Sequence, residues 1–298
     1  MQLKSLSKLV LSLGAVGVLA ACDPAATGEE GTADGSGVAG EIIVVSREDG
    51  SGTRGAFTEI TGVLAEDENG EEVDETYIEA VIQNGTEGVL STVAGDSSAI
   101  GYVSLGSLND TVRGLPIDGV EPTNETVQDG SFPISRNFNI AWNGDIEAVA
   151  QDFIDYILSA EGQEIAVNEG YVEFVSGAEA YAGDGSQSGS ISVVGSTSVT
   201  PLMEVLVEEY TALNPDVKID VTSNGSSAGM TAAMDGTADI GMASRELKED
   251  EAATLESTAI AVDGIAVITN KANEIENLTL DQVRQIFTGE VTEWEEVQ

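Results

Sequence analysis

The stretch I-I-V-V-S-R-E-D-G-S-G-T-R-G-A-F, residues 42–57, decides how this chain is organised. Its apolar start predicts a strand and the residues beyond it predict a helix, so the loop 49–53 lies at a strand-to-helix junction. Such a junction offers free N–H groups and the positive end of a helix dipole to an anion, and Arg47 adds a guanidinium suited to a tetrahedral oxyanion. The residues predict an anion cradle. An ordinary Gly-rich loop, in which Arg47 pairs with Asp49 or Glu48, is an equally good interpretation.

The composition narrows the functions that the chain can serve. Its 298 residues suffice for about two domains. A formal charge of −42, with only 11 Lys and Arg, argues against nucleic acid and anionic membrane surfaces as partners. The absence of histidine removes the commonest general base and metal ligand, which disfavours catalysis. An anionic ligand needs local donors here, or a medium salty enough to screen the protein's field over about 10 Å or less.

The first 40 residues have the features of export and anchoring. Lys4 and Lys8 precede a short apolar stretch that ends in Leu-Ala-Ala-Cys at Cys22. This pattern predicts a signal peptide over 1–21, and its end resembles the bacterial lipobox, whose cysteine is lipidated. An ordinary signal peptide with an incidental cysteine is the alternative. Residues 22–40 are rich in small and acidic residues and predict a flexible tether, so we expect an extracytoplasmic protein with a lipid (palmitate) anchor in the cell membrane.

Beyond residue 40 strands alternate with helices, which predicts parallel sheets covered by helices on both faces. The acidic stretch 67–75 predicts a loop or edge hairpin, and the Gly-, Ala- and Ser-rich stretch 176–189 predicts a linker. The expected strands are 41–46, 77–82, 99–103, 135–142, 190–194, 217–222, 238–242 and 265–269. The expected helices are 88–94, 145–158, 161–168, 200–213, one from about 228, one from 248, and 279–287.

Three later segments repeat the order of a strand, a loop rich in Gly, Ser and Thr, and a helix. They are Gly195–Ser198, Asn224–Gly229 and Met242–Glu246. Ligands of open parallel sheets bind beyond the carboxyl ends of the strands, so loops that face each other across a cleft would surround one small oxyanion. No loop is a Walker A motif, because no Gly-Lys-Ser/Thr follows. The residues favour an anion-binding protein over a nucleotide-binding protein or a serine-dependent enzyme.

Four long motifs together resemble a known family. S-R-E-D-G-S-G-T-R-G-A-F, V-G-S-T-S-V-T-P-L-M, N-G-S-S-A-G and D-I-G-M-A-S-R-E-L-K are similar to the substrate-binding lipoprotein of the phosphate ABC transporter (PstS-like), and the resemblance covers 41–298. It implies an α/β, two-lobed periplasmic-binding-protein-like fold (type II) with two crossing strands. It also implies a monomer without enzymatic activity or cofactor, which captures inorganic phosphate and delivers it to the permease subunits of the transporter.

The resemblance also implies a ligand set. By motif, the residues expected to bind phosphate are Arg47, Ser51, Gly52, Thr53, Thr197, Ser198, Ser226 and Ser244, with Asp49 holding Arg47 by a salt bridge. Some family members have an aspartate where Ser244 stands, and that carboxylate accepts the phosphate proton and excludes sulfate. A hydroxyl repels sulfate less, so sulfate or another tetrahedral oxyanion is an alternative ligand. A secreted phosphatase-like enzyme is the alternative of another class.

The order of the motifs departs from the usual family member, in which G-S-T-S comes before S-R-E-D-G-S-G-T. The chain is similar to a circular permutant that begins just before the strand at 42–46, with 176–189 joining the old ends. Mapped on the family architecture, one lobe consists of 41–135 plus 266–298 and the other of 136–265. The permutation predicts that Gln298 lies close to Glu41.

Overall fold

The computed structural model describes residues 39–67 and 72–297. The predicted signal peptide, the lipidation site Cys22 and nearly all of the predicted tether therefore lie outside the described residues. The fold described below is that of the second of two units, Ser36–Gln298. Among the described residues, no helix combines the length and apolar character needed to cross a membrane.

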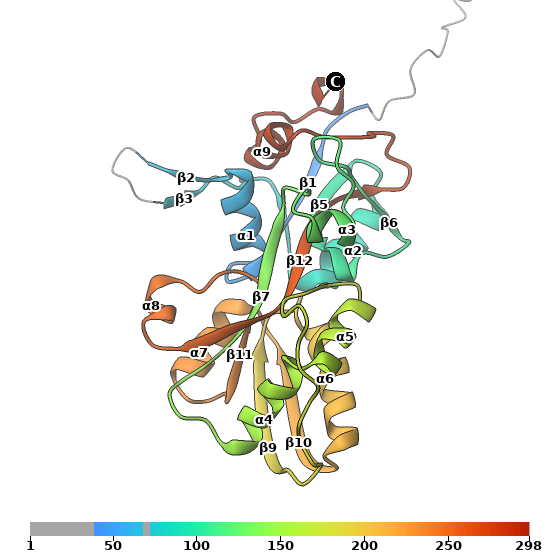
Figure 1. The fold of residues 1–298 in the computed structure, drawn as a ribbon. Coiled ribbons are helices and arrows are strands. Elements are labelled where there is room, and N and C mark those ends of the chain that lie inside the picture. Colours follow the sequence, from blue (N-terminus) through green and yellow to red (C-terminus); the bar gives the residue numbers. More distant parts are fainter. Residues whose placement is uncertain (1–38, 68–71, 298) are drawn as a thin grey trace, which may run out of the picture. The chain divides into compact units, whose positions relative to one another are not determined.

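Two antiparallel strands run between the two lobes of this unit. They are β7 (Ser135–Trp142) and β12 (Glu256–Asn270). Strand β12 pairs with β7 up to the register Gly264↔Ser135, and then pairs with β5 (Ala99–Ser104) from Ile265↔Ser104 onward. One strand therefore crosses from lobe B into lobe A (Figure 1). The lobe boundaries that the sequence predicts, 135/136 and 265/266, lie next to the residues at which β12 changes its pairing partner from β7 to β5.

Lobe A is built on the strand order β4-β1-β5-β12, with β6 also paired to β12. Strand β1 runs parallel to both of its neighbours, so its carboxyl end and the loop after it lie at one edge of the sheet. The other elements of lobe A are β1 (Ile43–Arg47), α1 (Gly52–Thr61), β2 (Leu64–Glu66), β3 (Glu72–Asp74), β4 (Val81–Gln83), α2 (Gly85–Gly95), η1 (Leu105–Ser107), β6 (Val112–Gly114), α3 (Asn124–Gln128), α9 (Leu280–Thr288) and η2 (Trp294–Val297).

Lobe B is built on the strand order β10-β9-β11-β7-β12, with β8 also paired to β12. Strand β9 is parallel to β10 and β11, whereas β11 is antiparallel to β7. The other elements of lobe B are α4 (Ala148–Ile157), α5 (Ala160–Asn168), β8 (Val172–Glu173), β9 (Ser188–Gly195), α6 (Thr200–Leu213), β10 (Asp216–Ser223), α7 (Ser226–Met234), β11 (Ile240–Ala243) and α8 (Glu249–Ala252).

Each lobe has its own apolar core, as expected for units that move as separate bodies. In lobe A, Phe57 stacks on Tyr102 with ring centroids 3.9 Å apart, in a cluster that also contains Trp294. In lobe B, Phe153 and Tyr210 belong to a second cluster that α4 and α6 contribute to. The two-lobed periplasmic-binding-protein-like fold inferred from the motifs is thus confirmed.

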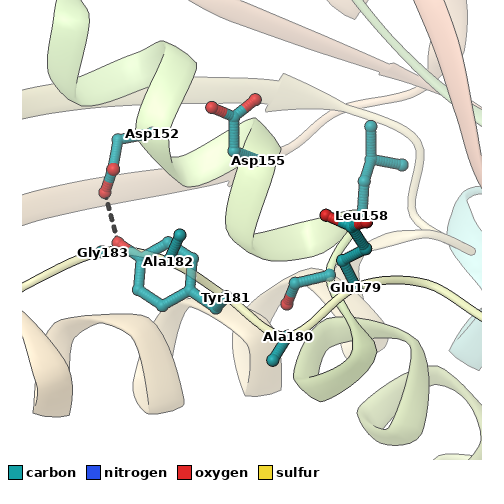
Figure 2. A pocket seen from close by; sticks show the side chains of 9 residues that line it. Asp152, Asp155, Leu158, Glu179, Ala180, Tyr181, Ala182 and Gly183 are labelled. Atoms are coloured by element: carbon teal, nitrogen blue, oxygen red, sulfur yellow. Dashed lines mark hydrogen bonds between the residues drawn. The ribbon is translucent and has the colours of Figure 1, made fainter.

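The predicted linker 176–189 packs on lobe B. The hydroxyl of Tyr181 donates a hydrogen bond to the carboxylate of Asp152 on α4 (Figure 2). The hydroxyl of Tyr210 donates to the same carboxylate over 2.8 Å. Burial and the bond to Asp152 raise the pKa of Tyr181 to about 12, so both hydroxyls stay protonated donors at neutral pH. The stretch that the sequence predicts as a connection is therefore fixed to the lobe by specific contacts.

The C-terminal segment lies beside the first strand of the fold. The amide of Ile42 donates to the Thr292 carbonyl over 2.8 Å, and the amide of Trp294 donates to the Gly40 carbonyl over 3.0 Å. Trp294 is fully buried. Gln298 itself lies outside the described residues, but the residues immediately before it lie close to Glu41, as a permuted chain requires.

Candidate oxyanion-binding site

Arg47 is the last residue of β1, and its side chain is buried. Its Nε and Nη2 atoms donate to the two carboxylate oxygens of Glu48 over 2.7 and 2.8 Å. Nη2 also donates to Thr197 Oγ1 of lobe B over 2.9 Å. Its Nη1 atom is buried without a hydrogen-bond partner among the described residues. A buried charged donor without an acceptor is costly, so this position favours an anionic ligand.

Asp49 was expected to hold Arg47 by a salt bridge, but the salt-bridge partner of Arg47 is Glu48. Asp49 is fully exposed and accepts a hydrogen bond from Arg54 over 3.2 Å, whereas Glu48 forms the fork with Arg47. Burial alone would raise the pKa of Glu48, but its bonds to Arg47 and the Gly85 amide outweigh burial and lower the pKa. Glu48 is therefore ionised and neutralises Arg47.

Hydroxyl groups from both lobes meet beside Arg47. Thr53 Oγ1 of lobe A lies 2.8 Å from Ser198 Oγ of lobe B. Ser196 Oγ donates to Ser244 Oγ over 2.9 Å, and Ser226 Oγ accepts from the Ser244 amide over 3.2 Å. All five side chains are buried. Because a hydroxyl both donates and accepts, these groups bond to one another and can also turn their protons toward an anion.

Helix N-termini add backbone donors to the cluster. Helix α1 begins at Gly52 with Ser51 as its N-cap, and the Ser51 side chain accepts from the Arg54 amide over 3.3 Å. Helix α7 begins at Ser226 in lobe B, after Gly225 with a positive φ of 102°. The partial positive charge of both helix ends lies where the hydroxyls meet, which favours a bound anion.

Three glycines shape the loop of lobe A. Gly50, Gly52 and Gly55 have the spacing G-x-G-x-x-G between a strand and a helix, a spacing also found in dinucleotide sites. Here Gly52 allows the lobes to touch, because a Cβ at this position would collide with Ser226 Oγ and lie 2.7 Å from Ser244 Oγ. The amide of Ser227 donates to the Gly50 carbonyl over 3.1 Å. The loop therefore packs directly against lobe B.

The structure brings the residues expected from the motifs to this one place. They are Arg47, Ser51, Gly52 and Thr53 from lobe A, and Thr197, Ser198, Ser226 and Ser244 from lobe B. Sequence reasoning did not place Ser196 or Thr86 in the site, and it named Glu48 only as a partner of Arg47 in an ordinary loop; Thr86 Oγ1 lies 3.4 Å from Ser198 Oγ. A signal for Thr86 was present, since Asn84-Gly85-Thr86 is another strand-to-helix junction.

Comparison with known proteins agrees with this geometry. The family model of the PBP superfamily domain matches residues 29–161 and 180–298. "Phosphate-binding protein PstS 2" of Streptococcus pneumoniae serotype 4 is 47% identical over 290 residues, which cover 97% of this chain and 99% of the relative. The chain belongs to the PstS-like proteins of the PBP superfamily. Its PstS-like relatives include "Phosphate-binding protein PstS 2" of Streptococcus agalactiae serotype V, 45% identical over 297 residues that cover 99% of this chain and 98% of the relative.

A solved structure supports the PstS-like fold. The crystal structure of a phosphate ABC transporter, phosphate-binding protein from Streptococcus pneumoniae TIGR4 shares 49% of its sequence with this chain, at a TM-score of 0.71. The match covers 87% of this chain and 100% of that structure. Because the alignment with the S. pneumoniae relative spans nearly the whole of both sequences, the PstS 2 relative has its segments in the same order as this chain.

Proposed function

We propose that this chain is an extracytoplasmic solute-binding protein that captures inorganic phosphate between its lobes and delivers it to an ABC transporter. The observation that carries the proposal is the buried Nη1 of Arg47, a charged donor without an acceptor beside hydroxyls from both lobes. The PstS-like relatives support phosphate as the ligand. The proposed ligand residues are Arg47, Ser51, Gly52, Thr53, Thr197, Ser198, Ser226 and Ser244.

Capture follows from the division of the donors between the lobes. Arg47 and Thr53 belong to lobe A, whereas Thr197 and Ser198 belong to lobe B. Contacts join the two lobes here, from Arg47 to Thr197 and from Thr53 to Ser198. An oxyanion that is bonded from both sides binds the closed form better than the open form, and so shifts the population toward closure. A transporter that recognises the closed form would then receive only loaded protein.

The chemistry of the donors also favours a second candidate ligand, sulfate. The carboxylate of Glu48 accepts two bonds from Arg47 and one from the Gly85 amide, so it serves mainly to hold the guanidinium. Ser244 offers a hydroxyl, which donates to a fully ionised anion as readily as it accepts from a protonated one. The geometry therefore supports oxyanion binding in general. The PstS-like relatives favour phosphate as the ligand.

Isothermal titration with phosphate and with sulfate tests the proposal. We expect phosphate to bind with a clear heat, and an Arg47→Ala variant to lose about a hundredfold in affinity, because one partner of a buried charged contact is removed. The exposed Arg284→Ala is the control and should bind as the wild type does. Equal affinity for sulfate would reduce the proposal to a general oxyanion-binding protein, and absence of binding to either anion would refute it.

The anchoring of the protein belongs to the same proposal. A signal peptide over 1–21, lipidation of Cys22 and a tether over 22–40 would hold a monomer at the outer face of the cell membrane, next to the permease subunits of its transporter. Incorporation of labelled palmitate into the cell-bound protein measures the anchor. We expect a Cys22→Ser variant to incorporate none, and equal labelling of this variant would contradict lipidation at Cys22.

A further inference from the structure

A buried ion pair lies on the crossing strands, behind the candidate site. Arg136 of β7 stands directly opposite Asp263 of β12 in the antiparallel register. Its Nη2 and Nε atoms donate to Asp263 Oδ2 over 2.9 and 3.2 Å, and both side chains are almost fully buried. Asp263 precedes by one residue the point where β12 leaves β7 for β5. The pair therefore sits at the junction between the lobes.

Hydrogen bonds extend this pair into both lobes. On the lobe A side, Ser104 Oγ at the end of β5 donates to Asp263 Oδ1 over 2.9 Å. On the lobe B side, Arg136 Nη1 donates to the carbonyl oxygen of Ser244 over 2.9 Å. The path Ser104–Asp263–Arg136–Ser244 thus runs from one lobe, through the crossing strands, to a wall of the candidate site.

A second side chain of β7 holds the same turn. Asn139 Nδ2 donates to the carbonyl oxygen of Arg245 over 3.0 Å, so two consecutive carbonyls after β11 are tied to the crossing strand. The Ser244 amide and hydroxyl contact Ser226 and Ser196 in the candidate site. The orientation of the peptide that carries Ser244 is therefore set from behind by Arg136.

Stability alone gives little reason for this pair. Burial raises the pKa of Asp263 and lowers the pKa of Arg136, because leaving water disfavours both charges more than their attraction and hydrogen bonds favour them. Apolar residues of similar size commonly replace a buried ion pair without loss of stability. A role in orienting the site accounts for the pair, because an arginine fork can hold a carboxylate and a carbonyl at fixed angles at once.

We propose that Arg136 and Asp263 are positioning residues for oxyanion binding, which hold the Ser244 wall in place relative to the crossing strands when the lobes close. The proposal rests on the proposed function, since it concerns the same site. Neither residue touches the ligand. Arg136 acts through the Ser244 carbonyl, and Asp263 acts by fixing Arg136 and by linking it to Ser104 of lobe A.

A double variant tests the proposal without leaving an unpaired buried charge. Arg136→Met with Asp263→Leu removes the pair and the bond to the Ser244 carbonyl together. The control is Arg284→Met with Glu290→Leu, which removes an ion pair of lobe A that makes no bond to the Ser244 carbonyl or to another residue of the candidate site. For each protein, the melting temperature, the phosphate Kd by titration and the phosphate-induced closure by small-angle scattering are measured.

We expect the Arg136/Asp263 double variant to melt near the wild type but to bind phosphate about tenfold or more weakly, the loss expected for one charge-assisted hydrogen bond. The control should keep the wild-type Kd. A wild-type Kd in the folded double variant, or an equal loss in the control, overturns the positioning role. If the wild type itself binds no phosphate, the proposed function fails instead.

If the double variant does not fold, the Arg136→Lys variant tests the positioning role of Arg136. Lysine keeps the charge opposite Asp263 but replaces the fork with a single ammonium, which cannot hold the carboxylate and the carbonyl with the same geometry. A folded Arg136→Lys protein with weakened phosphate binding supports positioning by the fork. An unchanged Kd overturns it.

Discussion

At the scale of single residues, the site depends on a salt bridge between sequence neighbours. Arg47 and Glu48 form a two-bond fork, and Glu48 also accepts a hydrogen bond from the Gly85 amide over 3.2 Å. The guanidinium is thereby fixed at the end of β1 with Nη1 left for a ligand. Since the pair is neutral, it adds no net charge to an already acidic protein, and we expect an anion to be bound mainly by neutral donors and by Nη1 of the buried fork.

The lowered pKa of Glu48 predicts a pH dependence of stability. Its contribution is fully present above the ordinary glutamate pKa of 4.5 and is lost as the pH falls through the lower pKa of the folded state. Thermal unfolding of the wild type and of Glu48→Gln, measured from neutral to acidic pH, should show a difference in melting temperature that shrinks below about pH 4.5. Asp263, whose pKa is raised, is present in both proteins and cancels in this comparison. A difference that grows toward acid would contradict the sign.

At the scale of elements, the N-terminus of α1 controls closure. Gly52 is its first residue and packs against Ser226 and Ser244 of the other lobe. A methyl group there would suit the helix, because alanine favours helical backbone over glycine, but would collide with lobe B. Substitution of Gly52 by alanine therefore tests two properties separately, the stability of lobe A and the closure of the lobes at the site.

We therefore expect Gly52→Ala to keep or raise the melting temperature while weakening phosphate binding by at least about tenfold. Gly95→Ala at the end of α2 is the control, because nothing lies within 4 Å of the added Cβ. Titration and thermal unfolding of both variants supply the two readouts. Wild-type phosphate affinity in Gly52→Ala would show that the lobes do not approach each other at this residue in the bound state.

At the scale of the whole fold, the described ends of the second unit support a permuted order. Residues 292–294 are hydrogen-bonded to 40–42, and the stretch 176–189 connects β8 to β9 on lobe B. We propose that the chain is a circular permutant of the order usual in the family. It shares the permuted order with its S. pneumoniae relative.

A chain returned to the other order tests the permutation. It would begin at Ser188, join Gln298 to Gly40 through a few Gly and Ser residues, and end at Val175. Because the joined ends are already adjacent, we expect it to fold and to bind phosphate within about threefold of the wild type. The control is this chain in its own order, with the same Gly and Ser residues inserted in 176–189. Loss of folding in the reordered chain alone would count against a permutation at this point.

Local signals in the sequence determined the parts of the fold that depend on near neighbours. The strand expected at 135–142 and the helix expected at 200–213 have these bounds in the structure. In contrast, only 265–269 was expected of β12, because its first half contains Glu256, Ser257 and Thr258 and ends in Asp263-Gly264, which lack an apolar strand pattern. That half is a strand because β7 supplies its partners, and pairing overrides propensity.

The sequence by itself determined the family, the two lobes and the four loops that meet at the site. Each loop is a short contiguous segment with Gly, Ser, Thr or Arg residues, so it can be recognised without the fold. Only the tertiary structure decided the partners. Glu48 rather than Asp49 holds Arg47, Thr53 meets Ser198 across 145 positions, and Arg136 reaches the Ser244 carbonyl across 108. Such contacts depend on the register of distant strands and on closure of the lobes, and neither is encoded in the residues that flank a motif.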